Sequence, residues 1–162
     1  MTPQKPLASR GRMCQVQSER DFEQRSAVST EQSPSADQLY GTWRLVVAKA
    51  FDVNGRLLPP PYGPVPMGRI VLNRDGRMMA VLCDGRPSLP FGEVRNYASY
   101  CGNFRIENNR LITTVDAADS PDRIGSQQVR RLAFRDGYLV LMPPPSQDGS
   151  QRELLWQRDG PP

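Results

Sequence analysis

From Leu39 onward, short runs of aliphatic, aromatic and β-branched residues alternate with two-residue turn signals. The turn signals are Asn54-Gly55, Asp75-Gly76, Asn108-Asn109 and Asp136-Gly137. Both central residues of a type I′ turn need a positive φ angle, which Asn, Asp and Gly tolerate, so each pair predicts a tight antiparallel hairpin. The runs between the turns predict strands at about residues 42–52, 56–58, 68–73, 77–83, 94–106, 111–118, 126–134, 138–142 and 151–158. Residues 35–40 predict one short helix, with Ser35 as its N-cap.

Successive side chains of a strand point to opposite faces, so each predicted strand has a dry side and a wet side. The dry sides consist of Trp43, Leu45, Val47 and Phe51 in the first strand and of Ala98, Tyr100, Gly102, Phe104 and Ile106 in the strand at 94–106. About eight consecutive antiparallel strands with one apolar face can close on themselves and remove both edges. The pattern therefore predicts an all-β fold, a single antiparallel up-and-down barrel of eight strands, rather than a two-sheet sandwich.

Composition changes this picture at the N-terminal end. Only 38% of the 162 residues are hydrophobic, below the roughly 45–50% of a typical folded domain, so part of the chain belongs to no core. We predict a disordered tail at residues 1–36, where apolar residues are scattered without period, and a barrel domain at 37–162. The barrel domain has 16 basic and 13 acidic side chains, an excess too small to indicate nucleic-acid binding.

The residue types present exclude much enzyme chemistry. The chain has no histidine, which removes the usual general base and the commonest metal ligand. Cys14, Cys83 and Cys101 are widely spaced and predict reduced thiols rather than a zinc site or disulfides. We therefore expect neither a metal nor a cofactor. The sequence has no signal-peptide pattern and no apolar run long enough to span a bilayer, so we expect a cytoplasmic monomer or homodimer without membrane partners.

Several short motifs, taken in order, resemble one known family. The opening Leu39-Tyr40-Gly41-Thr42-Trp43-Arg44-Leu45 resembles the Gly-x-Trp start of lipocalins and other calycin barrels. The motifs that follow it resemble the bacterial lipocalin-like domain family: Asn54-Gly55-Arg56, Leu58-Pro59-Pro60-Pro61-Tyr62-Gly63, Gly68-Arg69-Ile70, Asp75-Gly76-Arg77-Met78, Gln128-Val129-Arg130-Arg131-Leu132 and Leu155-Trp156. The resemblance covers residues 38–158 and implies an eight-stranded calycin-type barrel. It implies no set of catalytic residues.

The resemblance also implies two local features. In lipocalin-like barrels the first-strand tryptophan, here Trp43, closes one end beside an arginine of the last strand, for which Arg158 is our candidate. Members of the family often carry a His-His pair on the strand at 111–118, where this chain has Thr113-Thr114. Hydroxyl groups do not replace imidazole near neutral pH, so the resemblance implies ligand binding rather than histidine chemistry here.

Side-chain parity selects the candidate cavity residues. Arg130 shares its side with the larger apolar set of its strand, whereas the adjacent Arg131 faces the other way. An inward arginine needs an anion, either a ligand carboxylate, phenolate or enolate or, alternatively, an ion pair with Glu153 or Asp116. We expect Tyr100 to face inward too, as a ligand contact or as a core tyrosine. The expected ligand-binding residues are Tyr62, Tyr100, Phe104, Thr113, Val115, Gln128, Arg130, Leu132 and Leu141.

The proline-rich stretch at residues 59–66 cannot belong to a central strand, because proline lacks the backbone donor and fixes φ. It predicts a stiff loop, and three roles stay open for it. The loop covers one barrel end, forms a rigid lip that aims Tyr62 at a ligand, or offers a polyproline II segment to a partner domain.

Three classes of function follow from these observations. We expect a barrel that binds a small, largely apolar organic molecule carrying one acidic or carbonyl oxygen. The alternative is a cofactor-free isomerase, cyclase or lyase, in which Tyr100 and Arg130 stabilise an oxyanion and Glu153 acts as the base. The third class is an interaction module whose barrel is filled by its own side chains.

Overall fold

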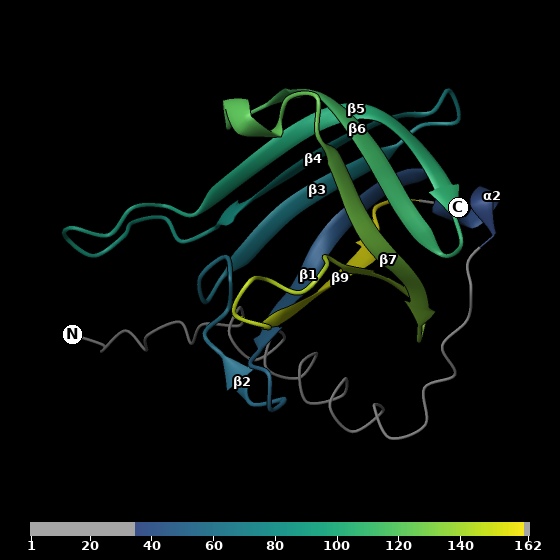
Figure 1. Ribbon diagram of the computed structural model, residues 1–162. Helices are drawn as coiled ribbons and strands as arrows, with labels where there is room; N and C mark the ends of the chain where they lie inside the picture. Colours follow the sequence, from purple (N-terminus) through teal and green to yellow (C-terminus); the bar gives the residue numbers. More distant parts are fainter. Residues whose placement is uncertain (1–34, 161–162) are drawn as a thin grey trace, which may run out of the picture. The chain divides into compact units, whose positions relative to one another are not determined.

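The computed structural model describes residues 35–160 (Figure 1). The elements are α2 (Ala36–Leu39), β1 (Gly41–Phe51), β2 (Leu57–Leu58), β3 (Pro66–Leu72), β4 (Arg77–Asp84), β5 (Tyr97–Glu107), β6 (Arg110–Ala118), the 3₁₀ turn η2 (Pro121–Arg123), β7 (Gln127–Arg135), β8 (Tyr138–Met142) and β9 (Gln151–Arg158). The predicted strands are confirmed to within a few residues at their ends, and so is the short helix. The tail predicted for residues 1–36 lies outside the described residues except for its last two. No helix in 35–160 has the length and apolarity to cross a membrane.

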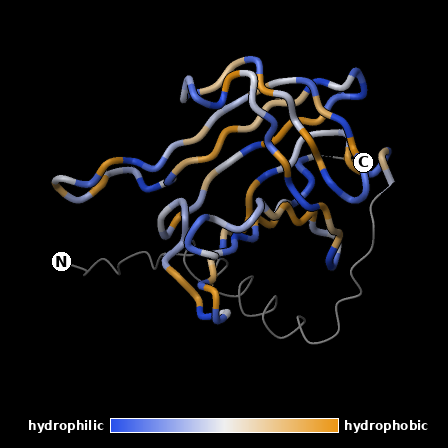
Figure 2. The backbone as a smooth tube through the Cα atoms, viewed as in Figure 1, coloured by the Kyte–Doolittle hydropathy of each residue, from blue (hydrophilic) through white to orange (hydrophobic). Residues whose placement is uncertain are grey.

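The strands form one antiparallel sheet that closes into a barrel. The strand order is β1-β3-β4-β5-β6-β7-β8-β9, and β9 pairs back onto β1, so eight strands form a closed ring. The short β2 extends the sheet only at the end of β1, where Leu57 and Leu58 pair with Phe51 and Ala50. Hydrophobic and hydrophilic residues alternate along the strands (Figure 2). The predicted eight-stranded up-and-down barrel is therefore confirmed.

The turn signals form hairpins of two kinds. At Asn108-Asn109 (φ 48° and 56°) and Asp136-Gly137 (φ 52° and 80°), both residues have positive φ, as a type I′ turn requires. At Asn54-Gly55 and Asp75-Gly76 only the glycine has positive φ, and its N–H donates to the carbonyl three residues earlier. The type I′ expectation is wrong for these two turns, which instead place a glycine in the bulge position of a longer hairpin loop.

The two ends of the barrel differ. The short turns β3–β4, β5–β6 and β7–β8 lie at one end, on the right of Figure 1, together with α2. This end is closed: Trp43 Nε1 donates to the Leu39 carbonyl at 2.9 Å, and the Arg158 guanidinium lies 4.4 Å from the centre of the Trp43 ring. The predicted contact between Trp43 and Arg158 is therefore present. The longer connections β2–β3, β4–β5, β6–β7 and β8–β9 lie at the opposite end.

A bulge in β1 changes which side chains face inward. The register of β1 against β9 shifts between Leu45 and Val47, and one extra residue in a strand reverses the alternation after it. Trp43 and Leu45 are buried before the shift, whereas Ala48 and Ala50 are the buried residues after it. The expectation that Val47 and Phe51 share the dry side of Trp43 is wrong for this reason. The predicted dry side of β5, which includes Tyr100, is confirmed by its burial pattern.

Candidate functional site

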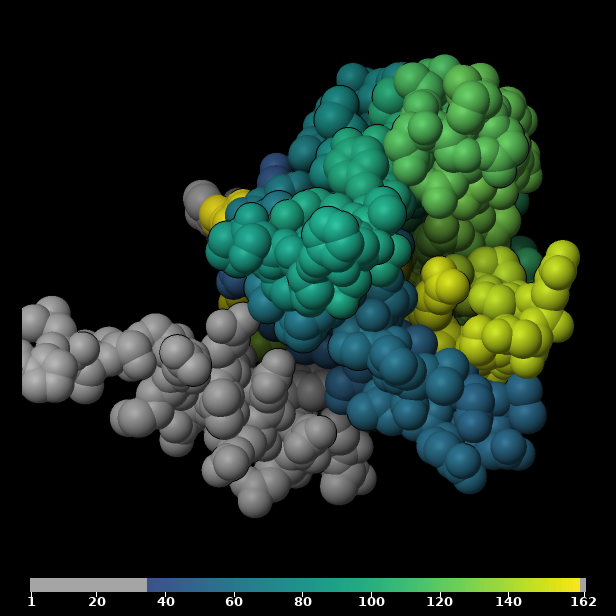
Figure 3. Space-filling view, turned by 90° about the vertical axis from the view of Figure 1, so that its left-hand side faces the viewer, coloured from purple at the N-terminus to yellow at the C-terminus, as the bar shows by residue number. Residues whose placement is uncertain are grey.

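A cavity of about 260 Å³ lies inside the barrel, next to the long connections. Figure 3 looks onto this end of the barrel, where the β4–β5 loop (teal) and the β6–β7 and β8–β9 connections (green and yellow) come together. The residues that line the cavity are Tyr62, Ile70, Ala80, Leu82, Ala98, Tyr100, Arg123, Gln128, Arg130, Leu141, Pro143, Arg152, Leu154 and Trp156. They come from the loops of this end and from the strands of the barrel wall as far as Trp156 on β9.

Side-chain size explains why only one half of the barrel is hollow. The cavity wall on β4 and β5 includes Ala80 and Ala98, whose side chains are small methyl groups that leave space in this half of the barrel. Toward the closed end the interior is packed with large side chains, including Trp43 and Leu72, both about 1% exposed or less. The expectation of a completely filled barrel therefore does not hold, because the large residues gather in one half.

One side of the cavity is cationic and rich in hydrogen-bond donors. Arg130 reaches it from β7, Arg152 from β9 and Arg123 from η2. Burial raises the pKa of the Tyr62 phenol above its ordinary value, and the charges of Arg152, Arg130 and Arg123, which lower it, only partly oppose this effect. Tyr62 is thus a neutral phenol at physiological pH, and its hydroxyl is able to donate a hydrogen bond.

Of the three arginines that line the cavity, two form no ion pair in the described part of the chain. Arg123 forms an ion pair with Asp119 at 3.1 Å. Arg130 donates only to neutral oxygens, the Val129 carbonyl at 2.8 Å and the Gln128 side chain at 3.2 Å. Among residues 35–160, no carboxylate forms an ion pair with Arg130 or Arg152, and no Asp or Glu lines the cavity. Arg130 and Arg152 therefore line the cavity without an ion pair. The pKa of the Asp148 carboxyl, outside the lining, is lowered by hydrogen bonds from Ser150 and to a smaller extent by the charge of Arg152.

The fold and the sequence lead to the same family. A family model described as a lipocalin-like domain matches residues 40–159, from the residue before β1 to the residue after β9. The chain belongs to the lipocalin-like domain family. Among curated proteins, none matches this lipocalin-like chain. Within the described part of the lipocalin-like domain, no three His, Cys, Asp or Glu side chains gather as a metal site would require.

The lipocalin-like barrel brings together some of the predicted site residues and not others. Five of them line the cavity, namely Tyr62, Tyr100, Gln128, Arg130 and Leu141. Phe104, Val115 and Leu132 instead pack in the hydrophobic core, and Thr113 is buried outside the cavity lining. All four lie on strands of the closed ring, but alternation predicts the face of a side chain and not its depth along the barrel.

The sequence reasoning did not predict the other nine lining residues, and three of these, Arg123, Arg152 and Trp156, carry hydrogen-bond donors. Arg152 and Trp156 lie on the same face of β9 as Leu154. The two-residue periodicity of the last strand was therefore a usable signal for both. Arg123 lies in the connection between β6 and β7, and nothing local indicates that its side chain turns toward the barrel interior. Only the closed ring brings these three residues to one cavity.

The two carboxylates considered as partners of Arg130 lie elsewhere. Glu153 pairs with Arg135 at 3.3 Å and lines a separate groove that includes Phe51 and Arg131. Because Glu153 alternates with the cavity residues Arg152 and Leu154, it points away from them. A role for Glu153 as a general base inside the cavity does not agree with this position.

Asp116 is engaged on the outer side of the lipocalin-like barrel. It accepts hydrogen bonds from Arg77, which hold the pKa of the Asp116 carboxyl below its ordinary value. The Cys101 thiol donates to Asp116 at 3.4 Å. Burial and this neighbouring carboxylate raise the pKa of the Cys101 thiol. Cys101 therefore stays protonated near neutral pH, where the thiol is a poor nucleophile.

The proline-rich loop carries Tyr62 into the cavity, as expected of a lip at the barrel mouth. Two close contacts fix the loop against the end of β4. A Cβ atom on Gly63, whose φ is +71°, would lie only 2.2 Å from Asp84 Oδ2. The Gly85 N–H donates to the Val65 carbonyl at 2.7 Å. The backbone that follows Tyr62 is thereby held close to the end of β4.

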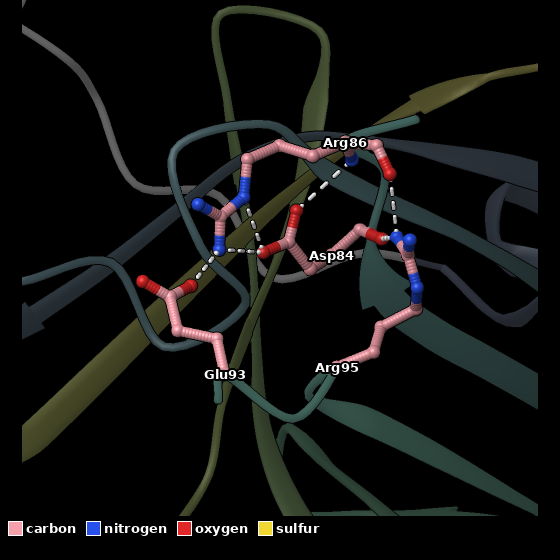
Figure 4. A network of polar contacts seen from close by, with 4 residues as sticks. All are labelled: Asp84, Arg86, Glu93 and Arg95. Carbon is pink, nitrogen blue, oxygen red and sulfur yellow. Dashed lines mark hydrogen bonds and ion pairs between the residues drawn. The ribbon is translucent and has the colours of Figure 1, made fainter. Parts of the chain in front are cut away.

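Asp84, which Gly63 approaches, belongs to a network of charged groups (Figure 4). Asp84 is 2% exposed and accepts hydrogen bonds from the Arg86 backbone N–H at 3.0 Å and from its Nε at 2.8 Å. Arg86 also pairs with Glu93 at 2.8 Å, and Arg95 donates to the Arg86 carbonyl at 2.7 Å. The bonds from Arg86 hold the pKa of the Asp84 carboxyl below its ordinary value. Asp84 at the end of β4 and Arg95 just before β5 are thus joined through Arg86.

Proposed function

We propose that this lipocalin-like barrel binds one compact, amphipathic organic anion, with the acidic group held at the barrel mouth by Arg130 and Arg152. The observation that carries the proposal is the pair of guanidinium groups that face a cavity without any carboxylate in its lining. A carboxylate or an enolate is the complementary ligand group, because the planar guanidinium fork binds such oxygens through two parallel hydrogen bonds.

The rest of the cavity supports an amphipathic ligand rather than an inorganic ion. The apolar part of the lining consists of Ile70 on β3 and Leu82 on β4, together with Leu141 and Leu154 on β8 and β9 beside the arginines. Tyr62 and Tyr100 add aromatic surface together with one hydroxyl each. Such a combination of an apolar wall with a few convergent polar groups is typical of small-molecule sites.

Cavity size limits the ligand. The volume of about 260 Å³ falls slightly below the range of roughly 300–1,000 Å³ that is common for small-molecule sites. We therefore propose a ligand the size of a substituted benzoate rather than a long-chain fatty acid. The alternative function, a cofactor-free isomerase, cyclase or lyase, gains no support, because the cavity lining supplies neither a carboxylate nor an imidazole as a base.

The first experiment is a thermal-shift comparison of the full chain with matched pairs of ligands. Para-isopropylbenzoate and para-isopropylbenzamide have nearly the same shape, but only the first is an anion at neutral pH. A ligand that binds only the folded state raises its apparent stability. We expect a saturable rise with the acid and none with the amide. Equal shifts with both compounds would show that charge does not direct binding.

The anchoring role of Arg130 has a matched control in the next residue. Because Arg130 lines the cavity and Arg131 lines the outer groove, Arg130→Leu and Arg131→Leu remove the same group from opposite faces of β7. Loss of a charge-assisted hydrogen bond is worth about 1.5–3 kcal/mol, so Arg130→Leu should weaken para-isopropylbenzoate binding by about 10- to 100-fold. Arg131→Leu should leave the affinity unchanged. Calorimetric titration measures both, and wild-type affinity in Arg130→Leu would refute the anchor.

A further inference from the structure

Arg130, the anchor of the proposed anion site, is held in place by two neutral acceptors. Its Nη1 donates to the Val129 carbonyl at 2.8 Å, and its Nη2 donates to the side-chain oxygen of Gln128 at 3.2 Å. A long side chain that is already fixed loses less conformational entropy when a ligand binds. The two bonds leave the other N–H groups of the guanidinium available for a ligand.

The amide of Gln128 is in turn oriented by Ser126, the residue before β7. The Ser126 hydroxyl donates to the Arg123 carbonyl at 2.7 Å, and Gln128 Nε2 donates to Ser126 Oγ at 3.1 Å. A serine hydroxyl has a single proton, which is used here on the Arg123 carbonyl, so Ser126 faces Gln128 as an acceptor. The amide therefore turns its NH₂ group toward Ser126 and its oxygen toward Arg130.

Backbone hydrogen bonds fix the position of Ser126. Its N–H donates to the Arg123 carbonyl at 3.0 Å, and its carbonyl accepts from the Val115 N–H at 3.0 Å. The neighbouring Gly125 N–H donates to the Val115 carbonyl at 2.8 Å. Ser126 is thus attached to β6 on one side and to η2 on the other, and it provides a fixed start for the series of bonds that ends at Arg130.

A neutral oxygen orients the guanidinium of Arg130 without neutralising it. Glutamate has nearly the same shape as glutamine, but at position 128 its carboxylate would form an ion pair with Arg130 and would occupy the group that attracts a ligand anion. The chain has glutamine at this position, and no Asp or Glu lines the cavity. The positive charge of Arg130 therefore stays available.

We propose that Gln128 makes the cavity selective for anions, because it holds Arg130 through a neutral oxygen and leaves the charge of Arg130 for the ligand. This inference rests on the proposed function, since Arg130 is the anchor of the acidic group. Gln128 is then a positioning residue. Ser126, which lies outside the cavity lining, acts on the site only through Gln128.

Two glutamate variants of neighbouring residues test the selectivity. Gln127 is exposed and alternates with Gln128, so Gln127→Glu and Gln128→Glu add the same charge to opposite faces of β7. We expect Gln128→Glu to bind para-isopropylbenzoate at least about tenfold more weakly, because the new carboxylate competes for Arg130. Its affinity for para-isopropylbenzamide should not fall. Gln127→Glu should bind the acid like the wild type in the same calorimetric titrations of the full chain.

Thermal unfolding without ligand separates this effect from damage to the fold. The new ion pair in Gln128→Glu should leave the unfolding midpoint unchanged or raise it, while the further rise on addition of para-isopropylbenzoate is lost. A merely structural role of Gln128 would instead lower the midpoint of the free protein.

Ser126 provides a second test that adds no charge. Ser126→Ala removes the acceptor that orients the amide, so the affinity for para-isopropylbenzoate should fall about threefold to tenfold. Ser126→Thr keeps a hydroxyl and should recover most of this loss. In a Gln128→Leu background, Ser126→Ala should cause no further loss, because Ser126 acts only through Gln128.

The outcomes separate this inference from the proposed function. Wild-type affinity for the acid in Gln128→Glu, with binding still weakened by Arg130→Leu, would refute the role of Gln128 and leave the anion site standing. Equal losses in the two glutamate variants would also refute it, since they would reflect net charge alone. Failure of the wild type to bind the acid at millimolar concentration would refute both. If Gln128→Glu does not fold, the serine variants decide: equal affinities in Ser126→Ala and the wild type would refute the role of Gln128.

Discussion

At the scale of single residues, Arg158 holds the closed end of the barrel together. Its guanidinium stacks on Trp43, with 4.4 Å between the guanidinium carbon and the ring centre, and donates to the Tyr40 carbonyl at 2.7 Å and to the Gln38 carbonyl. These carbonyls belong to α2 or to the residue that follows it, so one side chain of β9 joins this helix to β1. A planar cation suits both tasks, because its face stacks while its edge donates.

We predict that Arg158→Ala lowers the free energy of unfolding by about 2–4 kcal/mol, because a cation–π contact and two charge-assisted hydrogen bonds are lost. The free energy of unfolding of Arg158→Lys should lie between those of Arg158→Ala and the wild type, since lysine keeps the charge but lacks the planar guanidinium. Urea denaturation followed by tryptophan fluorescence measures both. The control is Arg56→Ala in the exposed β1–β2 turn, which should stay within about 0.5 kcal/mol of wild type. An equally small loss in Arg158→Ala would contradict the role of the stack.

At the scale of elements, the loop before β3 decides where Tyr62 lies. Its prolines restrict the backbone, and Gly63 packs directly against the Asp84 carboxylate at the end of β4. Asp84 is in turn fixed by Arg86 within the network of the β4–β5 connection. The position of one cavity phenol therefore depends on the junction of two loops that are separate in sequence.

We predict that Gly63→Ala weakens para-isopropylbenzoate binding severalfold, because the new methyl group displaces either the loop or Asp84. Gly55→Ala is a matched control, since its φ of +77° is similar but no atom lies within 4 Å of the added Cβ. Gly55→Ala should lose about 1 kcal/mol of stability through the strained backbone, and Gly63→Ala should lose more because its methyl group also meets Asp84. Only Gly63→Ala should also change the affinity in a calorimetric titration. Equal affinities in the two variants would show that the loop does not position a ligand contact.

At the scale of the whole molecule, aspartate hydrogen bonds make stability depend on pH. Arg86 lowers the pKa of Asp84, Arg77 that of Asp116, Ser120 that of Asp122 and Ser150 that of Asp148. In the unfolded chain an aspartate carboxyl has a pKa of about 3.9. The unfolded state therefore takes up protons at a higher pH than the folded state, so folding stability is retained above this value and lost as the pH falls further.

We predict that the free energy of unfolding is nearly constant between neutral pH and about pH 5 and falls steeply below about pH 4. Asp84→Asn should be less stable at neutral pH and should show a shallower decrease in acid, because the substituted side chain takes up no proton. Urea denaturation across this pH range measures the slope. An acid slope identical to that of the wild type would show that the Asp84 contacts contribute nothing to it.

The sequence by itself determined the features that depend on neighbouring residues. Turn dipeptides such as Asp136-Gly137 specify hairpins locally. A series of hairpins pairs each strand with its neighbours in sequence, which favours an up-and-down barrel. Alternation then placed Tyr100 and Arg130 on the inner face, because strand parity is a local property.

Tertiary structure alone decided the features that depend on closure of the ring. The bulge after Leu45 reversed the face of Phe51, and no local signal marks the extra residue. Whether an inward side chain meets a cavity or a filled core depends on the volumes of side chains on distant strands, which is why Thr113 lies outside the cavity lining. The convergence of Arg152 with Arg130 likewise depends on the registers in which β7 and β9 pair with β8 on either side.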